Sequence, residues 1–233
     1  MQKIHAKNSC KEFFVAPNCD RLQSVATDSY HSLLKKISSQ ELSHNLVAAA
    51  LGHDGRQAKD DITCGAIYSR CPRRLLVITG PPFNRERDSE LAEMVRTFKG
   101  RKAICGGTTA DIISRILGRQ VTMDLTHLDP EIPPGAEMEG VDLVTEGTIT
   151  LAKAAEILES GSPTNPIRKN SAYDLVSLML QSDIVEFVVG TRINEAHQDP
   201  SIPVELDLRR NIIRKIASLL ESRHLKESRL QFV

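Results

Sequence analysis

The feature that most constrains the fold is a strand, glycine turn and helix pattern that repeats after Arg74. The continuous apolar run Leu75–Thr79 is typical of a buried strand, and glycine and proline follow it directly. Apolar residues at helical spacing then extend from Asp88 to Phe98. A crossover helix can join parallel strands whereas a short hairpin cannot, so the repeat predicts a mostly parallel sheet covered on both faces.

The same pattern recurs along the rest of the chain. Lys102–Cys105 runs into two glycines and a helical stretch, and Val141–Thr145 leads through Glu146 and Gly147 into another. Further strands are expected at Gln120–Leu125, Ile184–Val189 and Leu230–Val233, with helices at Thr108–Leu117, Ile149–Leu158, Ser171–Leu180 and Leu208–Leu220. The predicted class is α/β, with a doubly wound, mostly parallel, Rossmann-like sheet over residues 74–233.

Residues 1–73 have a different character and predict a small α+β segment. The first 27 residues show no clear period, whereas apolar spacing over residues 28–51 predicts two helices. The β-rich run Ile62–Tyr68 predicts a strand, and Pro72 ends it. We therefore expect two domains, with the boundary between residues 73 and 74.

The turn Cys105–Thr109 is the sharpest candidate for a ligand site. Open parallel sheets bind ligands beyond the carboxyl ends of their strands, where helix N-termini present free amides. Two glycines let the backbone approach a ligand, and Thr108 with Asp111 fits a helix-capping arrangement. The turn matches neither the GxGxxG fingerprint of NAD sites nor the lysine-containing phosphate loop. Two interpretations stay open: a well-capped turn, or a contact for an anion or nucleotide.

Polar residues after two other predicted strands extend this candidate site. Glu146 lies where a carboxylate can accept a ribose hydroxyl or bind a cation, and Arg192 begins a polar set after a later strand. The candidate ligand-binding residues are Gly106, Gly107, Thr108, Thr109, Glu146, Gly147, Arg192 and Asn194. No set of nucleophile, base and orienting group in this part of the chain specifies a reaction.

Charge and cysteine content argue against several classes of protein. Lys+Arg 30 balances Asp+Glu 30, so we expect no nucleic-acid partner and no attraction to an anionic membrane. The five cysteines are scattered without zinc-site spacing, which indicates reduced thiols and a cytoplasmic location. No stretch approaches the roughly 20 apolar residues that span a bilayer. A small anionic ligand, a phosphoprotein substrate and a homo-oligomer stay open as partners.

One motif lies outside the α/β part. Asp60-Asp61-Ile62-Thr63 stands at the start of the predicted strand, within His53–Ile67. This stretch resembles the end of the catalytic domain of PPM-type metal-dependent serine/threonine phosphatases, specifically the stage II sporulation protein E branch, in which such a sequence opens the final strand. The resemblance implies that Asp60 is a metal ligand supported by Asp61. Two Mn²⁺ or Mg²⁺ ions would activate a water for attack on phosphorus.

The resemblance covers about residues 40 to 70. Nothing in residues 1–50 matches the family's other acidic ligands, so we expect an incomplete metal site and no phosphatase activity from this chain alone. The leading hypothesis is that the chain is the C-terminal part of a stage II sporulation protein E-like phosphatase, with a regulatory or ligand-sensing α/β domain. The alternative is a non-enzymatic module that binds a small anion or nucleotide-like molecule.

Overall fold

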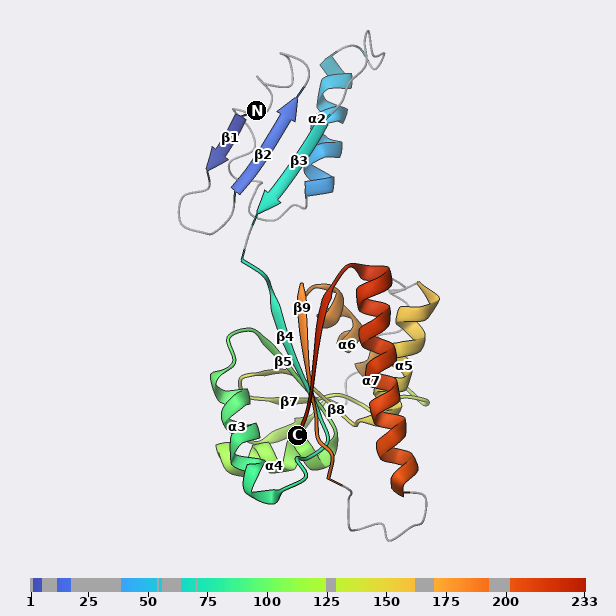
Figure 1. The fold of residues 1–233 in the computed structure, drawn as a ribbon. Helices are drawn as coiled ribbons and strands as arrows, with labels where there is room; N and C mark the ends of the chain where they lie inside the picture. The colour runs from blue at the N-terminus through green and yellow to red at the C-terminus, as the bar shows by residue number, and fades with distance from the viewer. Residues whose placement is uncertain are drawn as a thin grey trace. The chain divides into compact units, whose positions relative to one another are not determined.

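The chain forms two structural units. The computed structural model describes residues 2–5, 12–17, 39–53, 55, 64–69, 71–124, 129–161, 170–192 and 202–233. Contacts within the chain separate Met1–Cys71 from Pro72–Val233, two residues before the boundary expected from the sequence. Figure 1 shows the two units as ribbons.

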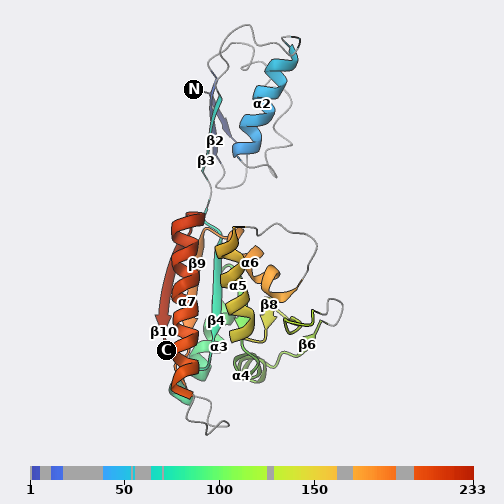
Figure 2. The same ribbon diagram turned by 90° about the vertical axis from the view of Figure 1, so that its right-hand side faces the viewer.

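The first unit combines one helix with a three-stranded antiparallel sheet. Strands β1 (Gln2–His5), β2 (Glu12–Pro17) and β3 (Cys64–Ser69) lie in that order. Helix α2 (Ser39–His53) lies against β3, as Figure 2 shows. Strands β1 and β2 were not predicted, because the first 27 residues give no clear alternation. The first of the two expected helices falls outside the described residues.

The second unit is an α/β structure built on a seven-stranded, mostly parallel sheet, as the sequence predicts. Its strands follow the spatial order β10-β9-β4-β5-β8-β7-β6. The first five in that order are parallel, whereas β7 and β6 are antiparallel to their neighbours. The strands are β4 (Arg74–Thr79), β5 (Arg101–Cys105), β6 (Val121–Met123), β7 (Ala136–Met138), β8 (Val141–Thr145), β9 (Ile184–Val189) and β10 (Glu227–Phe232).

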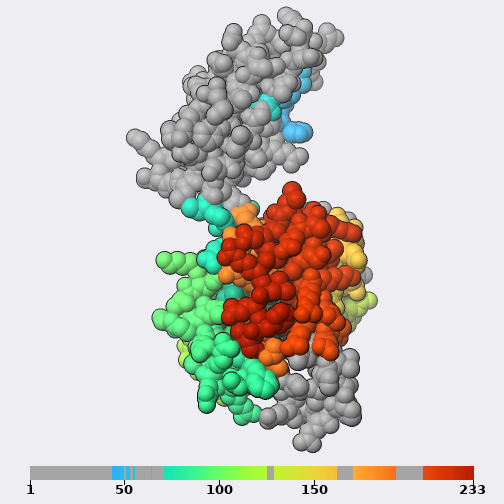
Figure 3. Space-filling model, in the orientation of Figure 1, coloured from blue at the N-terminus to red at the C-terminus, as the bar shows by residue number. Residues whose placement is uncertain are grey.

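Helices cover both faces of this sheet. The helices are α3 (Asp88–Thr97), α4 (Gly107–Leu117), α5 (Thr148–Ser160), α6 (Ser171–Leu180) and α7 (Ile202–His224), with a short 3-10 turn, η2 (Arg85–Arg87), before α3. Figure 1 shows α3 and α4 on one side of the strands and α5, α6 and α7 on the other. Helix α7 and strand β10 form much of the surface seen in Figure 3.

Strand β4 shows why the central strands are apolar throughout. Leu75 and Val77 pack with α5, α6 and α7, whereas Leu76 and Ile78 pack with α3 and α4. All four side chains are buried. Because successive side chains point to opposite faces, a strand covered on both sides needs a continuous apolar run.

The strand expected at Gln120–Leu125 is present as β6, but the sequence did not predict the hairpin to which it belongs. The chain forms a hairpin there, with β6 paired antiparallel to β7 and the Asp124 N–H donating to the Gly135 carbonyl at 2.9 Å. Strand β7 is only three residues long and follows a proline-rich loop, so its sequence carries little strand signal. Strand β10 begins earlier than expected, at Glu227, because its whole length pairs with β9. Helix α7 likewise begins earlier, at Ile202.

Candidate functional site

The neighbouring parallel strands β5 and β8 end side by side. The helix after β5 packs on one face of the sheet through Ala110 and Ile113, and the helix after β8 packs on the other face through Leu151. Adjacent strands whose connections leave to opposite faces open a ligand crevice at their carboxyl ends. We call this place the rim crevice, formed by residues 106–109 and 146–150.

The two glycine turns of the rim crevice touch each other. The Gly106 N–H donates to the Thr145 carbonyl at 2.9 Å, and a Cβ on Gly147 would lie 3.4 Å from the Gly106 Cα. Gly106 has a φ of 141°, a backbone conformation that L side chains rarely adopt. A Cβ on Gly107, in contrast, would meet nothing within 4 Å. The backbone is therefore fixed at Gly106 and open to an approaching molecule at Gly107.

Two helices start at the rim crevice without a side-chain cap. Gly106 is the N-cap of α4 and Gly147 the N-cap of α5, and neither helix has an acidic residue in its first turn. The first amides of a helix have no partner within the helix, and they form the positive end of its dipole. The capping role expected for Thr108 with Asp111 is therefore wrong. Because Gly106 adopts the turn conformation, the helix begins one residue earlier and Thr108 lies inside its first turn.

Buried hydroxyl groups surround the same turns. Thr79, Thr109 and Thr150 are at most 1% exposed, and among the described residues none of their hydroxyl groups has a hydrogen-bond partner. The Thr109 hydroxyl oxygen lies 3.3 Å from the position that a Cβ on Gly106 would take. A buried polar group without a partner costs about 1–3 kcal/mol. These hydroxyls are therefore unsatisfied groups in the interior, close in sequence or strand register to the glycine turns.

Cys105 lies next to two buried threonine positions, but its thiol is a poor nucleophile. It is level with Thr79 on one neighbouring strand and with Thr145 on the other. Burial raises the pKa of the Cys105 thiol to about 12, against a smaller opposing effect of the Thr145 side chain. A thiol that stays protonated is a poor nucleophile, so Cys105 packs in the core instead of acting in catalysis.

Glu146 is exposed at the end of β8, one strand away from the glycine turn after β5. The sequence candidates Gly106, Gly107, Thr109, Glu146 and Gly147 are therefore brought together. The ends of separate predicted strands thus lie together, as expected for the candidate site, although the β6–β7 hairpin separates β5 from β8 in the sequence.

Arg192 is placed elsewhere. Its guanidinium donates to the Pro82 carbonyl at 2.7 Å and forms an ion pair with the buried Asp88. The Arg209 side chain lies against Gly80, just after β4. The helices that follow β4 and β9 also pack on opposite faces of the sheet, but the Arg192 and Arg209 side chains fill the space at the ends of these two strands. Asn194, Asp60 and Asp61 lie outside the described residues.

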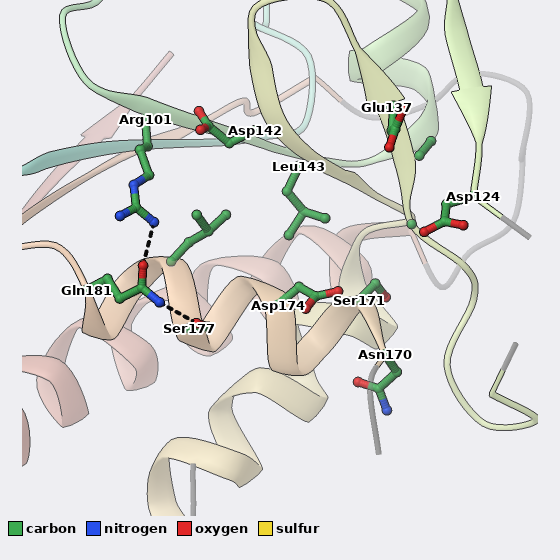
Figure 4. Close-up of a pocket in the computed structure, with 13 residues that line it drawn as sticks. Arg101, Asp124, Glu137, Asp142, Leu143, Asn170, Ser171, Asp174, Ser177 and Gln181 are labelled. Atoms are coloured by element: carbon green, nitrogen blue, oxygen red, sulfur yellow. Dashed lines mark hydrogen bonds between the residues drawn. The ribbon is translucent and has the colours of Figure 1, made fainter. Parts of the chain in front are cut away.

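A pocket lies between α6 and the strands β7 and β8 (Figure 4). It has a volume of about 360 Å³, and its lining carries the acidic residues Asp124, Glu137, Asp142 and Asp174. Several of its polar groups are engaged within the protein. Asp142 accepts from the Lys102 N–H at 2.8 Å, and Arg101 donates to Gln181 at 2.8 Å. The sequence gave no signal for this pocket, because its lining comes from separate segments without a shared motif.

Comparison with known proteins adds no relative. No family model, curated protein or solved structure matches the chain. Within the described ranges, no three His, Cys, Asp or Glu side chains are grouped to hold a metal ion. None of the helices in the described part of the chain is both long and apolar enough to cross a membrane.

Proposed function

We propose that residues 72–233 form a doubly wound, Rossmann-like domain that binds a small anionic ligand in the rim crevice. The observation that carries this proposal is the meeting of two uncapped helix N-termini at touching glycine turns. Each N-terminus is equivalent to about half a positive charge, so the pair can balance roughly one negative charge. Backbone amides that point outward from first helical turns are a recurrent phosphate-binding arrangement.

The open position at Gly107 gives a direct test. Gly107→Val adds a side chain into space that meets nothing within 4 Å, so the variant should fold while obstructing the amides of α4. We expect full-length protein to bind inorganic phosphate in ³¹P NMR or calorimetric titration, and Gly107→Val to weaken binding by at least about tenfold, since each lost charge-assisted hydrogen bond costs about 1.5–3 kcal/mol.

Ser89→Val is the matched control, because Ser89 is exposed in the first turn of α3. This variant should bind phosphate as the wild type does. Absence of phosphate binding by the wild type, or equal binding by Gly107→Val, would rule out an anion site in the rim crevice.

For the whole chain, we propose that it is the C-terminal part of a stage II sporulation protein E-like phosphatase. Its α/β domain would have a regulatory, ligand-sensing role. Asp60 and Asp61 come just before β3, a strand of an antiparallel sheet with α2 beside it. By the resemblance, this carboxylate pair supplies part of a Mn²⁺ or Mg²⁺ site, and the remaining ligands come from outside this chain.

Metal-dependent hydrolysis tests this second proposal. The chain is expected to hydrolyse a phosphoserine or phosphothreonine peptide with Mn²⁺ only when the missing acidic ligands are supplied, and Asp60→Ala should abolish that activity. The control is Glu41→Ala in the described helix α2. Activity that survives in Asp60→Ala would exclude the assigned metal ligand.

A further inference from the structure

The pocket between α6 and the strands β7 and β8 is separate from the rim crevice, because its lining residues lie outside the two glycine turns. Its volume of about 360 Å³ falls within the range of small-molecule sites, which is about 300–1,000 Å³. The pocket is therefore large enough for a small organic molecule, and its lining determines the class of molecule that fits.

Two acidic side chains of the lining share one face of the β6–β7 hairpin. Thr122 pairs with Glu137 in the ladder, and the Asp124 N–H donates to the Gly135 carbonyl at 2.9 Å. Because alternate residues of a strand share a face, Asp124 and Glu137 are diagonal neighbours with backbones about 7–8 Å apart. Two carboxylates at this spacing can contact one cationic group from two sides.

Helix α6 brings a third carboxylate to the same part of the pocket. A Cβ on Gly135 would lie 3.7 Å from the Ser171 Cβ, so the first turn of α6 packs against the hairpin at the level of Asp124. Asp174 follows Ser171 by three residues, which places both on one side of the helix. The Ser171 hydroxyl donates to the Pro133 carbonyl at 2.9 Å and holds the start of α6 in place. The acidic end of the pocket is therefore formed by fixed elements.

The rest of the lining indicates what kind of cation fits. Figure 4 shows Arg101, the one basic residue of the described lining, and Asp142 toward the other end of the pocket. Arg101 donates to Gln181 there at 2.8 Å. The half-buried Leu143 and Leu178 provide apolar surface in the lining. An acidic end beside apolar surface suits a cationic group that is carried on an aliphatic chain.

We propose that this pocket binds a small aliphatic amine. Its ammonium group lies among Asp124, Glu137 and Asp174, and its chain lies against Leu143 and Leu178. An ammonium group has three N–H donors, one for each carboxylate. The formal net charge of the protein is +0, so the attraction of a cation belongs to this pocket and not to the protein as a whole. The amine site does not depend on an anion in the rim crevice.

A ligand series tests the ammonium group and the chain separately. Full-length ¹⁵N-labelled protein is titrated by NMR with n-butylamine, methylamine, 1-butanol and magnesium chloride at constant ionic strength. We expect n-butylamine to bind at least about tenfold more tightly than 1-butanol, because the alcohol has no charge to strengthen its hydrogen bonds. It should also bind at least about tenfold more tightly than methylamine, which lacks the methylene groups that pack on the leucines.

Glu137→Gln removes one negative charge from the acidic end, at an exposed side chain. It should weaken n-butylamine binding by about tenfold and leave 1-butanol binding unchanged. Asp174→Asn should have the same effect from the side of α6. Glu139→Gln is the matched control, because Glu139 is also exposed and lies only two residues further along, in the turn between β7 and β8 and outside the lining. Equal thermal unfolding midpoints will confirm that the variants are folded.

Several results would overturn the amine site. Equal affinities for n-butylamine and 1-butanol would show that the pocket does not select a cation. Magnesium that displaces n-butylamine would indicate a metal site instead, and equal weakening by Glu137→Gln and Glu139→Gln would indicate general attraction to an acidic surface. Gly107→Val, which tests the rim crevice, should leave n-butylamine binding unchanged, so the amine site and the anion site can fail independently.

Discussion

Two glycines at the ends of the parallel strands differ sharply in what they require. A Cβ on Gly190 would lie 2.1 Å from the Pro81 carbonyl oxygen and 2.3 Å from that of Gly80, both of them backbone atoms. A Cβ on Gly107 would meet nothing within 4 Å. Gly190 is therefore needed for the close approach of two chain segments, whereas Gly107 leaves space for a ligand.

We predict that Gly190→Ala lowers the free energy of unfolding by about 3 kcal/mol, because the new methyl group forces backbone apart in a packed region. Gly107→Ala should change it by less than about 1 kcal/mol. Urea denaturation followed by circular dichroism measures both changes. Equal stabilities of the two variants would contradict the close packing at the end of β9.

Cys105 should resist thiol reagents in the folded protein. Its side chain is fully buried, and burial raises the pKa of the thiol to about 12. At pH 8 the folded state therefore carries almost no Cys105 thiolate, whereas an unfolded thiol has a pKa of about 8.5. Alkylation with peptide mapping should modify the exposed Cys71 first and Cys105 only on unfolding. Rapid modification of Cys105 in native protein would contradict its buried position.

At the scale of elements, α7 holds one layer of the second unit together. Ile213, Ile216 and Leu220 are fully buried and recur at helical spacing, so one side of the helix packs against the core. Residues outside this side include the exposed, charged Glu221. The helix is thus amphipathic, and its stability comes mainly from packing.

Ile216→Ala should lower the free energy of unfolding by about 2–5 kcal/mol, the range measured for large-to-small changes in packed cores. Glu221→Ala, on the exposed side of the same helix, should change it by less than about 0.5 kcal/mol. Thermal and urea unfolding of the two variants gives the comparison. A small effect of Ile216→Ala would show that α7 is loosely packed.

Elements with a strong local pattern were predicted well from the sequence. Leu75–Thr79 became β4 and Ile184–Val189 became β9, because continuous apolar runs reflect burial on both faces. The three-residue β7 gave too little pattern to be recognised. For the site, the glycines and Glu146 were identified as parts of one site at the strand ends, but the direct pairing of β8 with β5 was not, because a hairpin is inserted between them in the sequence. The placement of Arg192 likewise depends on Asp88, which is distant in the sequence.

At the scale of the whole molecule, the chain consists of two units with separate sheets. Strands β1 to β3 form one sheet and β4 to β10 form the other. Among the described residues, the second unit contains two large clusters of buried apolar side chains, one on each face of its sheet. A unit with its own core can unfold independently of its neighbour.

We therefore expect residues 72–233, produced alone, to unfold cooperatively. The midpoint should match that of one transition in the full chain to within a few degrees, because the contacts that stabilise this unit lie within it. Differential scanning calorimetry of the fragment and the full chain makes the comparison. A fragment without a cooperative transition would show that the first unit is required for the second to fold.

Helices α4 and α5 begin side by side yet pack on opposite faces of the sheet. A molecule bound to the first turns of both α4 and α5 would contact two helical layers that lie on opposite faces of the sheet. Its binding energy would then oppose the local opening of either layer. Saturation with such a ligand should slow amide hydrogen exchange in α4 and α5 together.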